Sequence, residues 1–151
     1  SDPAIKAMLS EQYSENAVTA DIYFAGVVEN RPKLQQAYND YFREHKVDAI
    51  VVPTTPLPAR SRKLSDVNKS IELNGRQVDT FLTYIRNVSA SSNVGLPALS
   101  IPAGLTDVGL PVGIEFVGSR LQDSKLLSIG RAFEYCKPFF PAPSLNTGQG
   151  S

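Results

Sequence analysis

Two short apolar runs lie between residues 93 and 118, and the rest of the chain is organised around them. A Gly-Leu-Pro step introduces each run, at residues 95–97 and 109–111. Because proline fixes φ and removes a backbone donor, each step predicts the entry of a strand. A polar loop at residues 106–108 separates the runs, so they form either a hairpin with a longer loop or neighbouring strands of a larger sheet. Both runs are apolar at nearly every position, which predicts helices over both faces.

The apolar spacing elsewhere in the chain predicts helices that cover those strands. The predicted helices span residues 1–10, 14–30, 31–46, 79–92 and 123–136. Asp79 and Asp123 are expected to cap the last two, because their side chains can accept a hydrogen bond from the first turn. The residues expected to face inward are Phe81, Tyr84, Ile85 and Val88 in the fourth helix, and Leu126, Leu127, Ile129, Gly130 and Phe133 in the last.

Residues 48–52 form a continuous, largely β-branched run that ends at a proline, which predicts a buried parallel strand with the preceding helix as its crossover. Ligands in open α/β sheets bind beyond the carboxyl ends of strands, so substrate contacts are expected in the loop at residues 54–58. The polar stretch at residues 59–68 is expected to be a solvated loop. Asn74 and Gly75 lie between two alternating segments and predict a type I′ hairpin, whose turn residues both need positive φ.

Composition excludes several classes of protein. Lys and Arg total 15 and Asp and Glu total 15, so no net charge attracts the chain to nucleic acid or to an anionic membrane. No apolar run approaches the roughly 18 residues of a membrane span, and the first residues lack the basic-then-apolar order of a secretion signal. With one cysteine and one histidine, a disulfide framework is excluded and a zinc site is not expected. The chain is therefore expected to be cytoplasmic and to hold no metal or cofactor.

The chain shows no self-contained catalytic group of residues. His45 at a helix end is expected to be a surface residue, and Cys136 at the end of a helical stripe a small core residue. The carboxylates around the central runs show no paired spacing for acid–base chemistry. None of the nearby serines lies in a Gly-x-Ser-x-Gly elbow, and hydroxyls at a helix end usually bond the backbone. These serines are Ser89, Ser91, Ser92 and Ser100.

Three segments carry a more specific pattern. Residues 48–56 combine an aspartate, an apolar run and a Pro-Thr-x-Pro step. Residues 95–104 read Gly-Leu-Pro-Ala-x-Ser-x-Pro-x-Gly, and residues 109–118 read Gly-Leu-Pro-x-Gly-x-Glu-x-x-Gly. In this order the segments resemble the amidase signature family, which carries Gln or Glu in the last motif. The resemblance covers about residues 46–136, and within the family the chain is similar to indoleacetamide and mandelamide hydrolases.

The resemblance implies an α/β fold in residues 1–143, namely the C-terminal part of a mixed β-sheet sandwiched by helices and incomplete on its own. Residues 144–151 are rich in Gly, Ser and Asn and predict a flexible tail. The resemblance also implies a hydrolase that converts a carboxamide to a carboxylic acid and ammonia with a Ser-Ser-Lys triad. The family places that triad in an N-terminal lysine segment and a Gly/Ser-rich region. No residue of this sequence stands in that context, so no catalytic residue is assigned.

Three residues are candidates for substrate binding. Thr54 and Thr55 lie beyond the end of a predicted strand, and Asn93 lies at the junction of a predicted helix and strand. Residues of these types bond turns and caps more often than they bind a substrate.

Two hypotheses remain open at this point. In the first, the chain is a segment of an amidase, inactive alone, whose partners are a small-molecule amide and the missing N-terminal catalytic portion. In the second, it is a non-catalytic binding or scaffold module derived from the same fold. A segment is expected to expose an apolar face or a strand edge and to self-associate, whereas a module should unfold cooperatively as a monomer. Neither hypothesis includes a nucleic acid or membrane partner.

Overall fold

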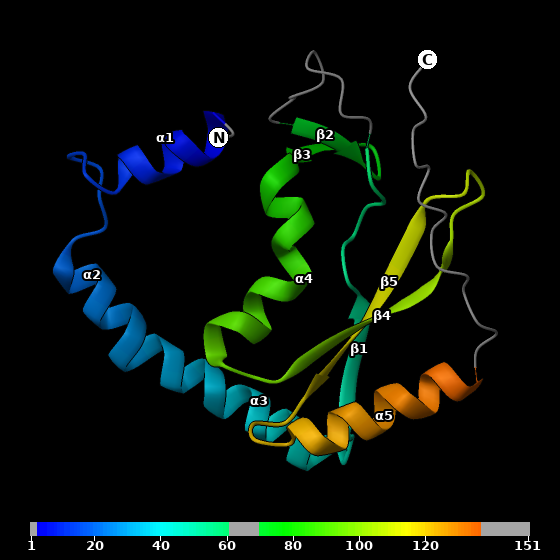
Figure 1. Cartoon of the computed structure of the whole chain (residues 1–151). Coiled ribbons are helices and arrows are strands. Elements are labelled where there is room, and N and C mark those ends of the chain that lie inside the picture. The colour runs from blue at the N-terminus through cyan, green and yellow to red at the C-terminus, as the bar shows by residue number, and fades with distance from the viewer. Residues whose placement is uncertain (1–2, 61–69, 137–151) are drawn as a thin grey trace, which may run out of the picture.

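The computed structural model describes residues 3–60 and 70–136 (Figure 1). A three-stranded antiparallel sheet lies at its centre, with β5 in the middle and β1 and β4 on either side. The strands are β1 (Ala49–Pro53), β2 (Ser70–Leu73), β3 (Arg76–Asp79), β4 (Ala98–Leu105) and β5 (Pro111–Gly118). The helices are α1 (Pro3–Glu11), α2 (Ala20–Phe24), the π-helix η1 (Ala25–Asn30), α3 (Arg31–His45), α4 (Thr80–Val94) and α5 (Asp123–Cys136).

The two Gly-Leu-Pro steps do introduce strands, and β4 and β5 are antiparallel neighbours, as expected. The predicted parallel direction of β1 is wrong, because β1 pairs antiparallel with β5 from Ala49↔Gly118 to Pro53↔Ile114. A continuous β-branched run indicates a strand that packs against other elements, but it does not tell whether the neighbouring strand is parallel or antiparallel. The side chain of Val51 is also 50% exposed, so β1 is not buried on both faces.

Helices cover both faces of the sheet, as the apolar pattern predicts. On one face, α5 places Leu126 against Ile101 and Phe116. On the other face, Val94 at the end of α4 packs with Leu96 and Val117. Burial is complete at the end of β5, but β4 keeps exposed positions, so the expectation that both runs are fully covered is wrong for β4. Within the described residues β4 is an edge strand, with fewer neighbours to cover it.

The N-terminal helices differ from the expected boundaries. The second helix was expected to begin at residue 14, but it begins at Ala20, where the Thr19 side chain accepts a hydrogen bond from the backbone N–H of Ile22. Residues 10–17 instead form successive turns closed by backbone hydrogen bonds. From α2 the chain passes through η1 directly into α3, which ends with Lys46 in the left-handed region.

Of the two later helices, α4 has its predicted cap, and both follow their predicted faces in part. Asp79 caps α4, since its carboxylate accepts a hydrogen bond from the N–H of Leu82 at 2.7 Å. Asp123 is the first residue of α5 rather than its cap. Phe81 and Leu127 are exposed, which corrects the expectation that they face inward. In α4 the buried positions are instead Thr83, Ser91 and Val94, whereas in α5 the predicted inward residues Leu126 and Gly130 are buried.

The predicted hairpin is confirmed. Asn74 and Gly75 have φ of 51° and 76°, and they join β2 to β3 as a two-residue turn. The predicted tail at residues 144–151 and most of the polar stretch at residues 59–68 lie outside the described residues. Among the helices that the structure describes, none is long and apolar enough to cross a membrane.

Gly130 sets the close approach of α5 to β4. A Cβ at this position would lie 2.9 Å from Cδ1 of Ile101 and would overlap Leu99. Gly130→Ala is therefore expected to lower the free energy of unfolding by about 1–3 kcal/mol, measured by urea denaturation. Gly26→Ala is the matched control, because no atom outside its own helix backbone lies within 4 Å of the added Cβ. The control should leave stability unchanged or raise it by up to about 1 kcal/mol. Equal effects of the two changes would contradict this packing.

Candidate functional site

Two hydroxyl groups meet above the central strand at one end of the sheet. Thr54 follows β1 and Ser100 lies in β4, and their Oγ atoms are 2.5 Å apart. The strands that carry them are separated by β5, so the two side chains reach toward each other across it. The backbone N–H of Thr54 donates to the carbonyl of Gly113 in β5 at 3.0 Å, which holds Thr54 in register beyond the end of β1. Ser100 is exposed and Thr54 half-buried, so the hydroxyl pair can be reached from solvent.

Gly113 makes this contact possible. A Cβ at Gly113 would lie 2.7 Å from Oγ1 of Thr54 and 3.1 Å from Oγ of Ser100. Any side chain there would push the two hydroxyls apart. Gly113, in the third sequence motif, therefore leaves room for side chains from the two flanking strands to meet. Its backbone φ does not itself require glycine.

Helix α4 holds the loop that carries Thr54. Asn87 Nδ2 donates to the carbonyl oxygen of Pro53 at 2.6 Å, and the Tyr84 hydroxyl donates to that of Pro58 at 2.7 Å. The Thr55 hydroxyl donates to the carbonyl oxygen of Leu57 at 2.7 Å, within the same loop. The structure thus places Thr55 in a turn-bonding role and leaves Thr54 facing Ser100.

A buried carboxyl group lies next to the hydroxyl pair on the same face of the sheet. Glu115 is 4% exposed and pairs with Ser100 across the β4–β5 ladder. Burial raises the pKa of Glu115 above its ordinary value of 4.5, and a hydrogen bond with Ser91 of α4 partly opposes that rise. Ser91 also donates to the carbonyl oxygen of Val88 at 3.1 Å.

Burial favours the neutral form of Glu115 and outweighs the hydrogen bond from Ser91, which favours the carboxylate. Glu115 Oε1 has no hydrogen-bond partner among the described residues, and an unpartnered buried oxygen is far less costly in a neutral acid than in a carboxylate.

The hydroxyl pair has hydrogen-bonding capacity left over. Each hydroxyl can donate one hydrogen bond and accept two, and the bond between them uses one donor. One O–H donor and several acceptor positions remain. A primary carboxamide presents a carbonyl acceptor and N–H donors, which match that set. Neither hydroxyl contacts a lysine or histidine within the described chain, so the pair lacks the base that a nucleophile needs.

The structure does not bring the three predicted binding residues together. Thr54 and Thr55 share the loop after β1, whereas Asn93 lies at the other end of α4. Gly113 of β5 lies beside Thr54, and Gly118 at the end of β5 bonds Pro97, which follows the C-terminal end of α4. These two glycines are five positions apart in the strand, which corresponds to about 16 Å. Asn93 instead lines a hollow of about 350 Å³ with Gly26, Val27, Asn30, Arg31 and Leu34.

The remaining candidate residues take structural or surface positions. Ser89 and Ser91 donate to backbone carbonyls in α4, as expected for helix hydroxyls. His45 is exposed beside the ring of Tyr41, as predicted. The expectation that Cys136 is a core residue is wrong, because its thiol is exposed where α5 ends.

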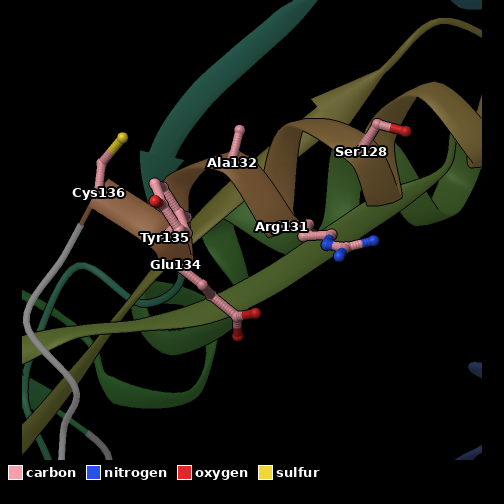
Figure 2. A pocket seen from close by; sticks show the side chains of 6 residues that line it. All are labelled: Ser128, Arg131, Ala132, Glu134, Tyr135 and Cys136. Atoms are coloured by element: carbon pink, nitrogen blue, oxygen red, sulfur yellow. The ribbon is translucent and has the colours of Figure 1, made fainter.

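A second hollow runs along α5. Figure 2 shows that its side chains project in different directions from the helix, with Cys136 on one side and Glu134 on the other, and do not converge on one point. No group of residues within the described ranges could hold a metal ion. The lining residues are Ser128, Arg131, Ala132, Glu134, Tyr135 and Cys136.

Comparison with known proteins assigns the chain to a family. The Amidase family model matches residues 2–127. The chain belongs to the amidase family. It is 48% identical over 115 residues to an indoleacetamide hydrolase of Agrobacterium vitis, covering 76% of this chain and 24% of that protein. It is 34% identical over 144 residues to a mandelamide hydrolase of Pseudomonas putida, covering 95% of this chain and 27% of that protein.

The fold agrees with this assignment. A crystal structure of an amidase superposes on 89% of this chain with a TM-score of 0.73 and 27% identity, over 29% of its own length. The amidase-family chain thus spans about a quarter of the length of the curated relatives it matches. The resemblance drawn from the three sequence motifs is confirmed, including the similarity to indoleacetamide and mandelamide hydrolases.

Sequence reasoning missed the grouping that the structure shows in this amidase-family chain. The sequence pattern marks Ser100 only as a possible nucleophile and Glu115 only as an unpaired carboxylate. A signal was present: Gly113 and Glu115 are two positions apart in a strand, so they share one face, and the antiparallel neighbours of that face include Ser100. The position of Thr54 opposite Gly113 could not be read in the same way, because it depends on the pairing of β1.

The buried acid predicts a pH-dependent stability. A group whose pKa is raised on folding contributes stability below its unfolded-state pKa, here about 4.5, and loses it as the pH rises through the folded-state value. Glu115→Gln keeps the shape and stays neutral. The variant is therefore expected to be more stable than the native chain at pH 7, with a difference that shrinks toward pH 4. Urea denaturation across that range measures it, and a difference independent of pH would contradict a buried acid of raised pKa.

The hydroxyl pair and Gly113 should be energetically coupled. Gly113→Ala is expected to lower the free energy of unfolding by about 1–3 kcal/mol, because the new methyl group overlaps Thr54. In a Thr54→Ala background Oγ1 is gone and the same change should cost less. The double-mutant cycle is expected to show a coupling of at least about 1 kcal/mol. Additive effects would mean that the two residues do not share the crowded contact.

Proposed function

We propose that this chain is a segment of an enzyme that hydrolyses a carboxamide to a carboxylic acid and ammonia. In this proposal the chain supplies sheet strands and one wall of the substrate pocket, and a Ser-Ser-Lys triad lies in polypeptide outside the chain. The observation that carries the proposal is the exposed Thr54–Ser100 hydroxyl pair in a member of the amidase family, with amide-matching donors and acceptors and no base beside it. By itself the chain is expected to be inactive.

The proposed substrate is an acetamide with an aromatic group. Two relatives of this chain are named for indoleacetamide and mandelamide, and both compounds join a ring to a short amide. Thr54 is the proposed contact for the amide group, assisted by Ser100. Thr55 and Asn93 remain predicted contacts, although Thr55 bonds its own loop and Asn93 lies at the opposite end of the sheet.

A chimaeric enzyme tests this proposal. The segment of the Pseudomonas putida mandelamide hydrolase that matches this chain is replaced by this chain, whose match covers 95% of it. We expect the chimaera to release ammonia from mandelamide and to react with a serine-directed covalent probe, and the isolated chain to do neither. Stoichiometric labelling of the isolated chain would overturn the external triad. An inactive but folded chimaera would favour the non-catalytic binding module.

Substitutions in the chimaera test the hydroxyl pair. Thr54→Val and Ser100→Ala are each expected to lower kcat/KM for mandelamide by about tenfold or more, because a hydrogen bond to the amide is lost. Ser128→Ala is the matched control, since its hydroxyl donates to the carbonyl of Ser124 within α5, outside the site. Thermal midpoints measured on the same samples separate a loss of contact from a loss of folding. Unchanged kcat/KM in both site variants would remove Thr54 and Ser100 from the pocket.

A further inference from the structure

The N-terminal arm, residues 3–30, consists of α1, α2 and η1 and has no core of its own. No side chain described within residues 5–30 is buried. Large apolar side chains are nevertheless frequent there, and they are exposed. Those in α2 and η1 are Ile22, Tyr23, Phe24, Val27 and Val28.

Helix α2 is apolar around most of its circumference. Ile22, Tyr23 and Phe24 are consecutive and 64%, 67% and 63% exposed. Successive residues of a helix point about 100° apart, so these three side chains cover more than half of the helix surface. A helix that is apolar on all sides belongs in a protein interior, whereas a surface helix has a single apolar stripe. This pattern requires cover on more than one side of α2.

The described chain does not supply that cover. The elements packed most extensively against η1 are α2 and α3, its neighbours in sequence. Figure 1 shows the arm curving away from the sheet, with α1 and α2 on the far side of α4.

Charge limits what can cover the arm. Residues 3–30 contain one lysine, Lys6, and four carboxylates, Glu11, Glu15, Asp21 and Glu29. An acidic arm is repelled by anionic lipid and by nucleic acid, and helices that lie on membranes are rich in Lys and Arg instead. The surface that covers the arm is therefore expected to belong to a protein.

The comparisons indicate which protein surface it is. The family match begins at residue 2, so the arm belongs to the amidase domain itself. The superposed amidase uses only 29% of its chain for the part that resembles this one. We infer that the arm inserts into the remaining polypeptide of an amidase, with α2 and η1 enclosed on more than one side. This inference rests on the proposed function, because it takes the missing catalytic portion as the partner.

Hydrogen exchange of the mandelamide hydrolase chimaera tests the insertion without relying on activity. In the isolated chain the amides of residues 20–30 are expected to exchange rapidly. In the chimaera they should be protected by about a hundredfold or more, because opening then requires breaking a buried interface. Protection that is equal in the two proteins and independent of concentration would overturn the inference. Protection of the isolated chain that grows with its concentration would mean that a second copy covers the arm, and would overturn it as well.

A matched pair of substitutions locates the interface. Tyr23→Asp places a charge on α2, and Tyr135→Asp makes the same change on an exposed helix outside the family match. We expect Tyr23→Asp to abolish most of the protection of residues 20–30 and to lower the thermal midpoint of the chimaera, and Tyr135→Asp to do neither. Equal effects would overturn the inference. A protected arm in an inactive chimaera would support the insertion while refuting the proposed function, so the two can fail separately.

Discussion

The burial of β5 on both faces is the constraint that organises this structure. The strand ends in Phe116, which packs under α5, and Val117, which packs under α4. Because neighbouring positions of a strand point to opposite faces, a strand that is apolar at successive positions needs a layer on each side. Helix α5 and the end of α4 supply those layers, and Gly130 lets α5 come close to the sheet.

The same face that receives α4 carries the polar residues of the candidate site. Glu115 lies under α4 beside Ser91, and Thr54 and Ser100 meet on the same face of the sheet. Helix α4 thus contributes twice, since it buries Glu115 through its C-terminal half and holds the loop after β1 through Asn87 and Tyr84. A shift of α4 would alter the hydroxyl pair and the buried acid together.

Membership of the amidase family explains why an ordered sheet and an uncovered arm occur in one chain. The sheet region carries the three motifs and forms its own core, so its packing is satisfied within the described residues. The arm carries comparable apolar side chains, none of which is buried among the described residues, and the proposed insertion into the rest of an amidase would cover them.

The sequence by itself determined the local elements and the family. The Gly-Leu-Pro steps, the Asn74-Gly75 turn and the Asp79 cap act through backbone geometry and hydrogen bonds only a few residues away, so they can be read from neighbouring residues. Tertiary structure alone decided the direction of β1, the exposure of Phe81 and Leu127, and the meeting of Thr54 with Ser100 above Gly113. Each of these depends on which strand or helix lies alongside, and that choice is made by contacts between residues tens of positions apart, which local periodicity does not contain.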